Sequence, residues 1–136
     1  MIDKGQIDFS SAERIDLGHS IIFRRTDGII EIDCSDNFEY EVKHIKENYV
    51  QLKKFSDSKK ILVLSCAKPF TTTTKEVRDF IASAPHRNFV KAEAFVIHTL
   101  GQSIMGNFFL KVNKPIVPAK FFKNKTEAEK WLKSFE

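Results

Sequence analysis

From residue 19 onward, short apolar runs alternate with segments in which apolar residues recur every three or four positions. The short runs have the length of β-strands, and the spacing of three and four is that of a helix with one buried face. A helix between two strands crosses over the sheet, so that the strands on either side of it run parallel. The order of segments is β-β-α-β-α-β-α-β-α. We therefore predict an α/β fold in a single domain, a mixed, mostly parallel sheet of about five strands with four flanking helices.

The first two strands are predicted to form a hairpin. Segments 19–25 and 29–34 flank Thr26-Asp27-Gly28, and an Asp-Gly pair between two such runs is a strong hairpin signal. The alternating residues that share one face of the second strand are Ile30, Ile32 and Cys34. Residues 1–18 show no sustained period and predict a short N-terminal arm, which leaves 19–136 as the domain.

Capping motifs predict where the helices begin. Asp36 with Glu39 has the spacing of a capping box, and so has Thr73 with Glu76. The last helix has two alternative caps, Asn124 with Glu127 or Thr126 with Glu129. The predicted buried stripes are Phe38, Val42, Ile45, Tyr49, Leu52 and Phe55; then Val77, Phe80, Ile81 and Ala84; then Ile104, Met105, Phe108, Phe109 and Val112; and finally Ala128, Trp131, Leu132 and Phe135.

Three further runs are predicted to be strands. Residues 61–66 are almost continuously apolar, which is typical of a strand covered on both faces. Residues 89–99 and the segment 119–122 are the other two, and a helix over 100–112 separates them. No internal repeat interrupts this order.

Composition excludes membrane-spanning and exported proteins. No apolar run approaches the roughly 20 residues that a membrane-spanning helix needs, and the first twenty residues are polar and acidic where a signal peptide needs an apolar stretch. We therefore expect a cytoplasmic protein, in which Cys34 and Cys66 are reduced, buried, small hydrophobes. A disulfide between them is the less favoured alternative.

The net charge of +4 is unevenly distributed. Residues 1–40 hold nine acidic and four basic residues, a net −5, whereas the remainder holds 18 basic and nine acidic residues, a net +9. The lysines around the last strand and helix are Lys111, Lys114, Lys120, Lys123, Lys125, Lys130 and Lys133. No arginine lies among the basic residues from Lys91 onward, which argues against nucleic acid. A solvated lysine face is the simplest interpretation, and an anionic lipid surface or an acidic protein is the functional alternative.

Four local motifs stand out in the second half of the chain. They are Lys91-Ala92-Glu93-Ala94-Phe95-Val96, Gly106-Asn107-Phe108-Phe109-Leu110-Lys111, Lys114-Pro115-x-x-Pro118-x-x-Phe121-Phe122 and Glu127-Ala128-x-x-Trp131-Leu132. With the order of the segments, these motifs resemble the STAS (SpoIIAA-like) domain family. The family is typified by bacterial anti-sigma-factor antagonists, and the branch that this chain resembles is grouped with Sec-fourteen-type lipid cradles. The resemblance covers 19–136 and implies a non-enzymatic module of the bacterial cytoplasm that binds a partner protein or a small ligand.

In the antagonist branch, a serine or threonine that follows the central strand is phosphorylated. The resemblance makes Ser65, Thr71 and Thr72 candidates for such a phosphoswitch. The family's Asp-Ser-Ser-Gly-like element is absent, since the chain reads Ser65-Cys66-Ala67-Lys68-Pro69-Phe70. The competing interpretation is a helix cap with spare threonines beside it, because Thr73 with Glu76 alone satisfies the capping pattern.

Thirteen phenylalanines are a heavy apolar load for 136 residues. One interpretation is a pocket between sheet and helices, as in a carrier of a small apolar or lipid-like ligand. The candidate lining residues are Phe80, Phe89, His98, Met105, Phe108 and Phe109. The competing interpretation, which the helical spacing favours, is ordinary packing in the core.

Catalysis and metal binding are not predicted. Ser65 or Cys66 with His98 would lie at the carboxyl ends of parallel strands, as a nucleophile pair requires, but no Gly-x-Ser-x-Gly motif and no acidic partner accompanies them. The four histidines lie on separate elements, so we expect no metal and no cofactor. Our first prediction is therefore a regulatory or protein-interaction module that uses the loop 71–74 and the third helix, with the carrier as the alternative. Exposed strand edges at the hairpin favour a homodimer.

Overall fold

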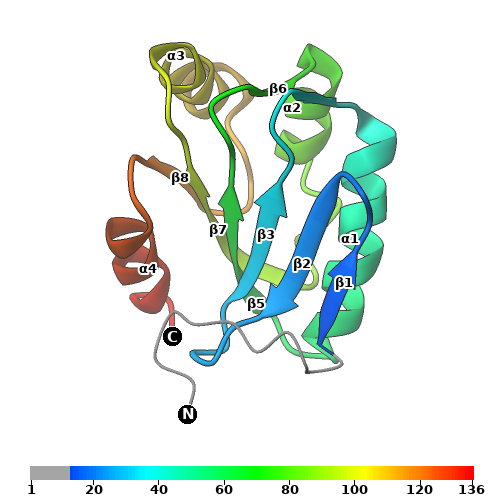
Figure 1. Ribbon diagram of the computed structural model, residues 1–136. Coiled ribbons are helices and arrows are strands. Elements are labelled where there is room, and N and C mark those ends of the chain that lie inside the picture. The colour runs from blue at the N-terminus through cyan, green and yellow to red at the C-terminus, as the bar shows by residue number, and fades with distance from the viewer. Residues whose placement is uncertain (1–12) are drawn as a thin grey trace.

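A six-stranded mixed sheet lies at the centre of the molecule (Figure 1). The computed structural model describes residues 13–136, and residues 1–12 of the predicted arm lie outside this range. The strands, in spatial order, are β1 (Arg14–Asp16), β2 (Ser20–Arg24), β3 (Ile30–Cys34), β5 (Ile61–Cys66), β7 (Val90–Val96) and β8 (Ala119–Phe122). The first three are antiparallel, and β3, β5, β7 and β8 run parallel. The predicted mixed, mostly parallel sheet is confirmed, with β1 as an additional strand.

Helices cover both faces of this sheet. They are α1 (Val42–Ser56), α2 (Lys75–Ala82), α3 (Leu100–Phe108), which continues into the π-helical turn η1 (Phe109–Asn113), and α4 (Lys125–Lys133). Figure 1 shows α4 on one side of the sheet and α1 on the other. Successive side chains of a strand point to opposite faces, and accordingly Val63 belongs to the core under α1 whereas Leu64 belongs to the core under α4.

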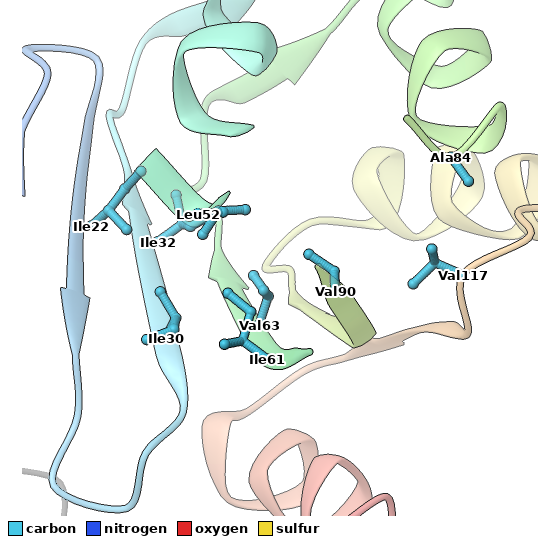
Figure 2. Close-up of a cluster of buried hydrophobic side chains, with 9 residues drawn as sticks. All are labelled: Ile22, Ile30, Ile32, Leu52, Ile61, Val63, Ala84, Val90 and Val117. Carbon is cyan, nitrogen blue, oxygen red and sulfur yellow. The ribbon is translucent and has the colours of Figure 1, made fainter. Parts of the chain in front are cut away.

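The larger core lies between the sheet and α1. Its buried residues are Ile22, Ile30, Ile32, Leu52, Ile61, Val63, Ala84, Val90 and Val117 (Figure 2). Leu52 on α1 lies beside Ile32 on β3, and both side chains are buried. The smaller core lies under α4, where Ala128 and Leu132 are fully buried. The start of α4 follows the first of the two predicted caps, because the Asn124 side chain accepts a hydrogen bond from the Glu127 N–H at 2.9 Å.

The predicted hairpin is present, but its outer edge is covered. β2 and β3 pair antiparallel, and Gly28 supplies the positive φ (88°) that the turn between them requires. β1 then pairs with β2 from the other side. In the described part of the chain, the edge strands of the six-stranded sheet are therefore β1 and β8, and the hairpin is not at an edge. This corrects the expectation that exposed hairpin edges would mediate self-association.

The predicted start of the first helix at Asp36 is wrong. Residues Phe38–Tyr40 form a short strand, β4, and the helix begins only after Glu41, which shares a capping box with His44. Asp36 instead accepts hydrogen bonds from the Asn37 and Phe70 N–H groups. Its carboxylate thus stabilises a turn and holds a neighbouring loop, rather than capping a helix.

The predicted cap of the second helix is also displaced. Residues Thr71–Thr73 form β6, which pairs in parallel with β4 in a separate two-stranded sheet. The N-cap is therefore Thr74, whose hydroxyl accepts a hydrogen bond from the Val77 N–H at 3.2 Å. Pairing with β4 takes Thr73 out of the capping position.

The predicted inner face of the third helix is mostly exposed. Of its five residues only Phe109 is buried, and the exposed members are Ile104, Met105, Phe108 and Val112. Apolar residues surround much of α3, but the helix backbone approaches the sheet closely at Gly106, which lies against Phe121 on β8. The remaining apolar residues face outward or toward a cavity.

A candidate ligand-binding cavity

A cavity of about 690 Å³ opens at the carboxyl ends of the parallel strands, between the sheet and α1, α2 and α3. Ligands of open α/β sheets bind at this edge, and volumes of roughly 300–1,000 Å³ are typical of small-molecule sites. Its apolar walls are formed by Ile45, Val77, Ile81, Phe95, Val96, Ile97, Ile104, Met105, Phe109 and Phe121. Place, size and lining are those of a binding site for a small apolar molecule.

The parallel register of the strands builds the floor. Ser65 on β5 is level with Phe95 on β7, which is in turn level with Phe121 on β8, so the three side chains share one face. The rings of Phe95 and Phe121 are stacked with centroids 4.8 Å apart, and Phe109 stands edge-on to both at 6.4 and 6.1 Å. A rigid aromatic floor results.

Side-chain amides hold the third helix over this floor at both of its ends. The Gln102 amide donates to the carbonyls of Lys68 and Thr71 at 2.8 and 3.0 Å, and its oxygen accepts from the His98 N–H at 2.7 Å. At the other end, the Asn113 amide donates to Asp79 on α2 at 2.6 Å. The loop 67–71 is thereby fixed to the first turn of α3, and η1 to α2.

Two of the polar residues that line the cavity have unused hydrogen-bonding capacity. Asn48 on α1 is 4% exposed, and its Oδ1 has no hydrogen-bond partner among the described residues. Arg78 on α2 donates from Nη1 to the carbonyl and hydroxyl of Thr73, both at 3.3 Å, while its Nε is buried without an acceptor. An apolar cavity with a few oriented polar groups is the usual arrangement for specific binding.

The two cysteines are free thiols, and burial raises the pKa of both. Burial raises the pKa of the Cys66 thiol to about 12, and burial likewise raises the pKa of Cys34. Cys34 lines the cavity, where its Sγ lies 3.9 Å from Oγ of Ser65. Cys66 points to the opposite face, into the core under α4. Both side chains are neutral thiols near pH 7, and the thiol is not the nucleophilic form of cysteine.

Of the six predicted pocket residues, the structure brings two to the cavity. Met105 and Phe109 line it, whereas Phe80, Phe89, His98 and Phe108 do not. Phe108 is exposed on the outer side of α3. The His98 ring lies 2.8 Å from the carbonyl of Ala67, on the surface.

Phe80 and Phe89 belong to an aromatic group away from the cavity lining. Their ring centroids lie 5.9 and 6.2 Å from that of Tyr49, which also stacks on His86 at 4.6 Å. The His86 ring in turn meets the buried Glu93 carboxylate, with Nε2 and Oε2 2.5 Å apart. This group extends the core between α1, α2 and the sheet.

The three phosphoswitch candidates occupy different environments. Ser65 is half-buried and faces the cavity. Thr71 is buried, and its hydroxyl both accepts from the Lys68 N–H and donates to the Ser35 carbonyl, each at 2.8 Å. Thr72 is exposed on β6. Of the three, Thr72 has the side chain that a kinase could reach without opening the fold.

The nucleophile pair considered from the sequence is not assembled. Strand alternation sends Ser65 and Cys66 to opposite faces of β5, and the recorded partner of the His98 ring is a backbone carbonyl. In the described part of the chain, no group of three His, Cys, Asp or Glu side chains is placed to hold a metal ion. Among the helices of residues 13–136, none combines the length and the apolar character that crossing a bilayer requires.

Several cavity residues were missed from the sequence, although a signal for some was present. Asn48 falls between Ile45 and Leu52 on the predicted buried stripe of α1, where a polar residue needs an explanation. Phe95 lies at the centre of the predicted strand 89–99, and only the observed end of β7 at Val96 places it near the carboxyl edge, where ligands of parallel sheets bind. Arg78 carries no such signal, because an arginine one position from Val77 looks like an ordinary solvent-facing residue.

The fold and cavity together define an α/β domain of the SpoIIAA-like class. A solved structure from Shewanella loihica PV-4, described as an uncharacterized protein of the DUF3478 family with a SpoIIAA-like fold, is similar to this chain with a TM-score of 0.57. It is 15% identical, and the match covers 83% of this chain and 91% of that one. The predicted resemblance is thus confirmed at the level of the fold.

The family follows from the sequence match. The chain belongs to the family described as a domain of unknown function, DUF7793, whose model matches residues 23–136. No curated protein matches the chain.

Proposed function

We propose that this domain is a non-catalytic module that holds a small apolar ligand in the cavity between the sheet and α3. The observation that carries the proposal is the cavity itself, about 690 Å³ in volume and walled by isoleucine, valine, phenylalanine and methionine. Removing apolar surface from water stabilises a complex by roughly 25 cal/mol per Å² before the costs of association. The proposal favours the carrier over the protein-interaction module that the sequence suggested first.

The unpaired amide of Asn48 supports the same proposal. A buried acceptor without a partner costs about 1–3 kcal/mol, and Asn48 lines the cavity. A hydrogen-bond donor on a bound molecule would recover this cost. The buried, unpaired oxygen of Asn48 is thus explained by a ligand that carries a hydrogen-bond donor opposite it.

The absence of catalysis remains part of the proposal. Raised thiol pKa values make Cys34 and Cys66 poor nucleophiles, and the hydrogen-bond partner of the His98 ring is the Ala67 carbonyl. The two free thiols also support placing the protein in the reducing environment of the bacterial cytoplasm.

A matched pair of tryptophan variants tests the cavity. Met105→Trp fills space in the cavity, whereas Phe108→Trp adds the same ring three residues on, outside the lining. With N-phenyl-1-naphthylamine, a neutral apolar dye, as the probe, we expect Met105→Trp to raise the Kd by about tenfold or more and Phe108→Trp to leave it nearly unchanged. Equal effects of the two variants, or no dye binding by the wild type, would contradict the proposal.

One observation favours a second candidate function, recognition of a protein partner. Leu100, Ile104, Phe108 and Val112 are spaced by four on α3 and η1 and are 77, 57, 47 and 60% exposed. A contiguous exposed apolar stripe commonly marks an interaction surface. A second copy of this chain is the simplest partner to test, by sedimentation velocity over a range of concentrations. A dimer that Phe108→Lys abolishes would support this function, and a monomer at every concentration would exclude the second copy as partner.

A further inference from the structure

The cavity lining contains a positively charged side chain and no negatively charged one among the described residues. Among the described residues that line it, Arg78 is the one with a charged side chain, and neither aspartate nor glutamate contributes. The other polar contributors are uncharged near pH 7: Cys34, Tyr40, Asn48, Ser65, Thr71, Thr72, Thr73, Thr99 and Gln102. A lone guanidinium beside apolar walls produces a positive potential that no acidic side chain of the lining balances.

Arg78 has hydrogen-bonding capacity to spare. It forms no ion pair in the described part of the chain, and its recorded hydrogen bonds are the two long ones from Nη1 to Thr73. Its Nε is buried and lacks an acceptor. Asp79, the adjacent acid, is already engaged by Lys75 at 2.7 Å and by Asn113 at 2.6 Å. A guanidinium offers five N–H donors in a planar fork, and the hydrogen bonds to Thr73 use Nη1 alone.

We infer that the ligand of this cavity carries a single carboxylate, which binds Arg78, while the rest of the molecule, aliphatic apart from the donor that Asn48 accepts from, occupies the apolar interior; the inference rests on the proposed function. A guanidinium binds a carboxylate through two parallel N–H···O hydrogen bonds. One cation matches a monoanion, whereas a phosphate monoester brings close to two negative charges to a lining without a second cation. The ligand class is therefore an aliphatic carboxylic acid of fatty-acid type.

The test compares compounds that have the same alkyl chain length and differ in the head group. Dodecanoate, dodecan-1-ol, methyl dodecanoate and dodecyl phosphate, each below its critical micelle concentration, compete with N-phenyl-1-naphthylamine for the wild-type chain. We expect dodecanoate to bind about tenfold or more tightly than the alcohol and the ester, because a charge-assisted bidentate pair replaces a neutral contact. The phosphate should bind less tightly than the carboxylate.

Three variants test whether Arg78 causes the preference for the carboxylate over the alcohol. Arg78→Gln should remove the difference between acid and alcohol while leaving the alcohol within about twofold of its wild-type Kd, since the apolar contacts persist. Arg78→Lys should keep part of the preference, because the charge remains but the fork is lost. Lys111→Gln removes an exposed charge outside the lining and should change neither ligand. Thermal melting of each variant confirms that it is folded.

The outcomes separate this inference from the function on which it rests. Equal binding of acid and alcohol by the wild type would overturn the carboxylate and leave an apolar-ligand carrier. A preference that survives in Arg78→Gln would overturn the role of Arg78, and tighter binding of the phosphate would replace the carboxylate by a phosphorylated ligand. Failure of the dye and of all four compounds to bind would overturn the proposed function itself.

Discussion

Gly106 on α3 lies against the face of Phe121 on β8, so closely that a Cβ at this glycine would stand 2.9 Å from Cδ2 and 3.0 Å from Cγ of the ring. The ring has little room to retreat, because its other neighbour is Phe95, stacked at 4.8 Å. The helix backbone therefore rests directly on the aromatic floor. This contact fixes the distance between α3 and the sheet, and therefore how far Met105 and Phe109 project into the cavity.

Gly106→Ala should destabilise the domain, although alanine is ordinarily the better helix former. The gain of up to about 1 kcal/mol from helix propensity is outweighed by overpacking, which typically costs about 1–3 kcal/mol. Gly101→Ala is the matched control on the same helix, because its Cβ would meet Thr99 Oγ1 at an ordinary 3.9 Å. Urea unfolding of the two variants checks the prediction, and a Gly106→Ala chain as stable as Gly101→Ala would show that the ring moves freely.

We expect Asn48 to contribute to ligand binding rather than to the stability of the fold. Asn48→Leu removes a buried oxygen that lacks a partner, so we expect the free energy of unfolding to stay constant or rise by about 1 kcal/mol. Binding of a polar-headed ligand should weaken in the same variant. Urea unfolding gives the first quantity and dye competition the second. A loss of stability larger than about 2 kcal/mol would mean that the amide makes a native hydrogen bond.

The buried thiols predict a loss of stability in alkali. The folded pKa of Cys66 is raised to about 12 from an ordinary value of 9.0, with burial as the main cause. Above the unfolded pKa the unfolded chain loses this proton while the folded chain keeps it. The stabilisation is thus fully present below about pH 8 and falls toward pH 12, by up to about 1.4 kcal/mol per pH unit.

Urea unfolding at about pH 7.5 and pH 10 measures this slope. Cys66→Ala should lower stability at both values but flatten the difference between them, because the variant has one fewer group to titrate. Lysines and tyrosines titrate in the same window and contribute equally to both chains. Parallel slopes for the wild type and the variant would refute the assignment to Cys66.

The sequence predicts those elements whose local pattern is unambiguous. β5 and β8 were predicted with their observed bounds, 61–66 and 119–122, because each is an apolar run between residues that break structure. The three-residue β4 was missed because Phe38 stands four positions before Val42 and so fits the stripe of α1. A strand of that length is too short to show a period of its own.

The cavity could not be predicted from the spacing of apolar residues, because it depends on contacts between residues that are distant in the sequence. Helical spacing indicated a broad apolar face on α3, but not that Ile104 and Phe108 would be left without a covering layer. That outcome follows from the narrow contact at Gly106, a long-range relation to Phe121. The pairing of Ser65 with Phe95 likewise needs the strand register, which parallel crossovers leave open in the sequence.

The mouth of the cavity should depend on Gln102. Its amide bridges the carbonyls of Lys68 and Thr71 and accepts from the His98 N–H, so it joins the loop 67–71 to the first turn of α3. Gln102→Ala removes these hydrogen bonds, together with the longer ones to the Thr99 N–H and the Pro69 carbonyl, and should lower the free energy of unfolding by about 1–3 kcal/mol. Local opening of the loop should rise by more than the global change requires.

Hydrogen exchange of the amides in 68–71 measures that opening directly. We expect exchange about tenfold faster in Gln102→Ala than in the wild type, with protection of β5 and β7 lowered only by the global loss of stability. Ser103→Ala is the matched control, one residue along the same turn and without a recorded side-chain hydrogen bond to the loop. If the loop exchanges equally in both variants, Gln102 does not hold the mouth. If it exchanges faster only in Gln102→Ala, and the dye then associates and dissociates faster, this side chain controls access to the cavity.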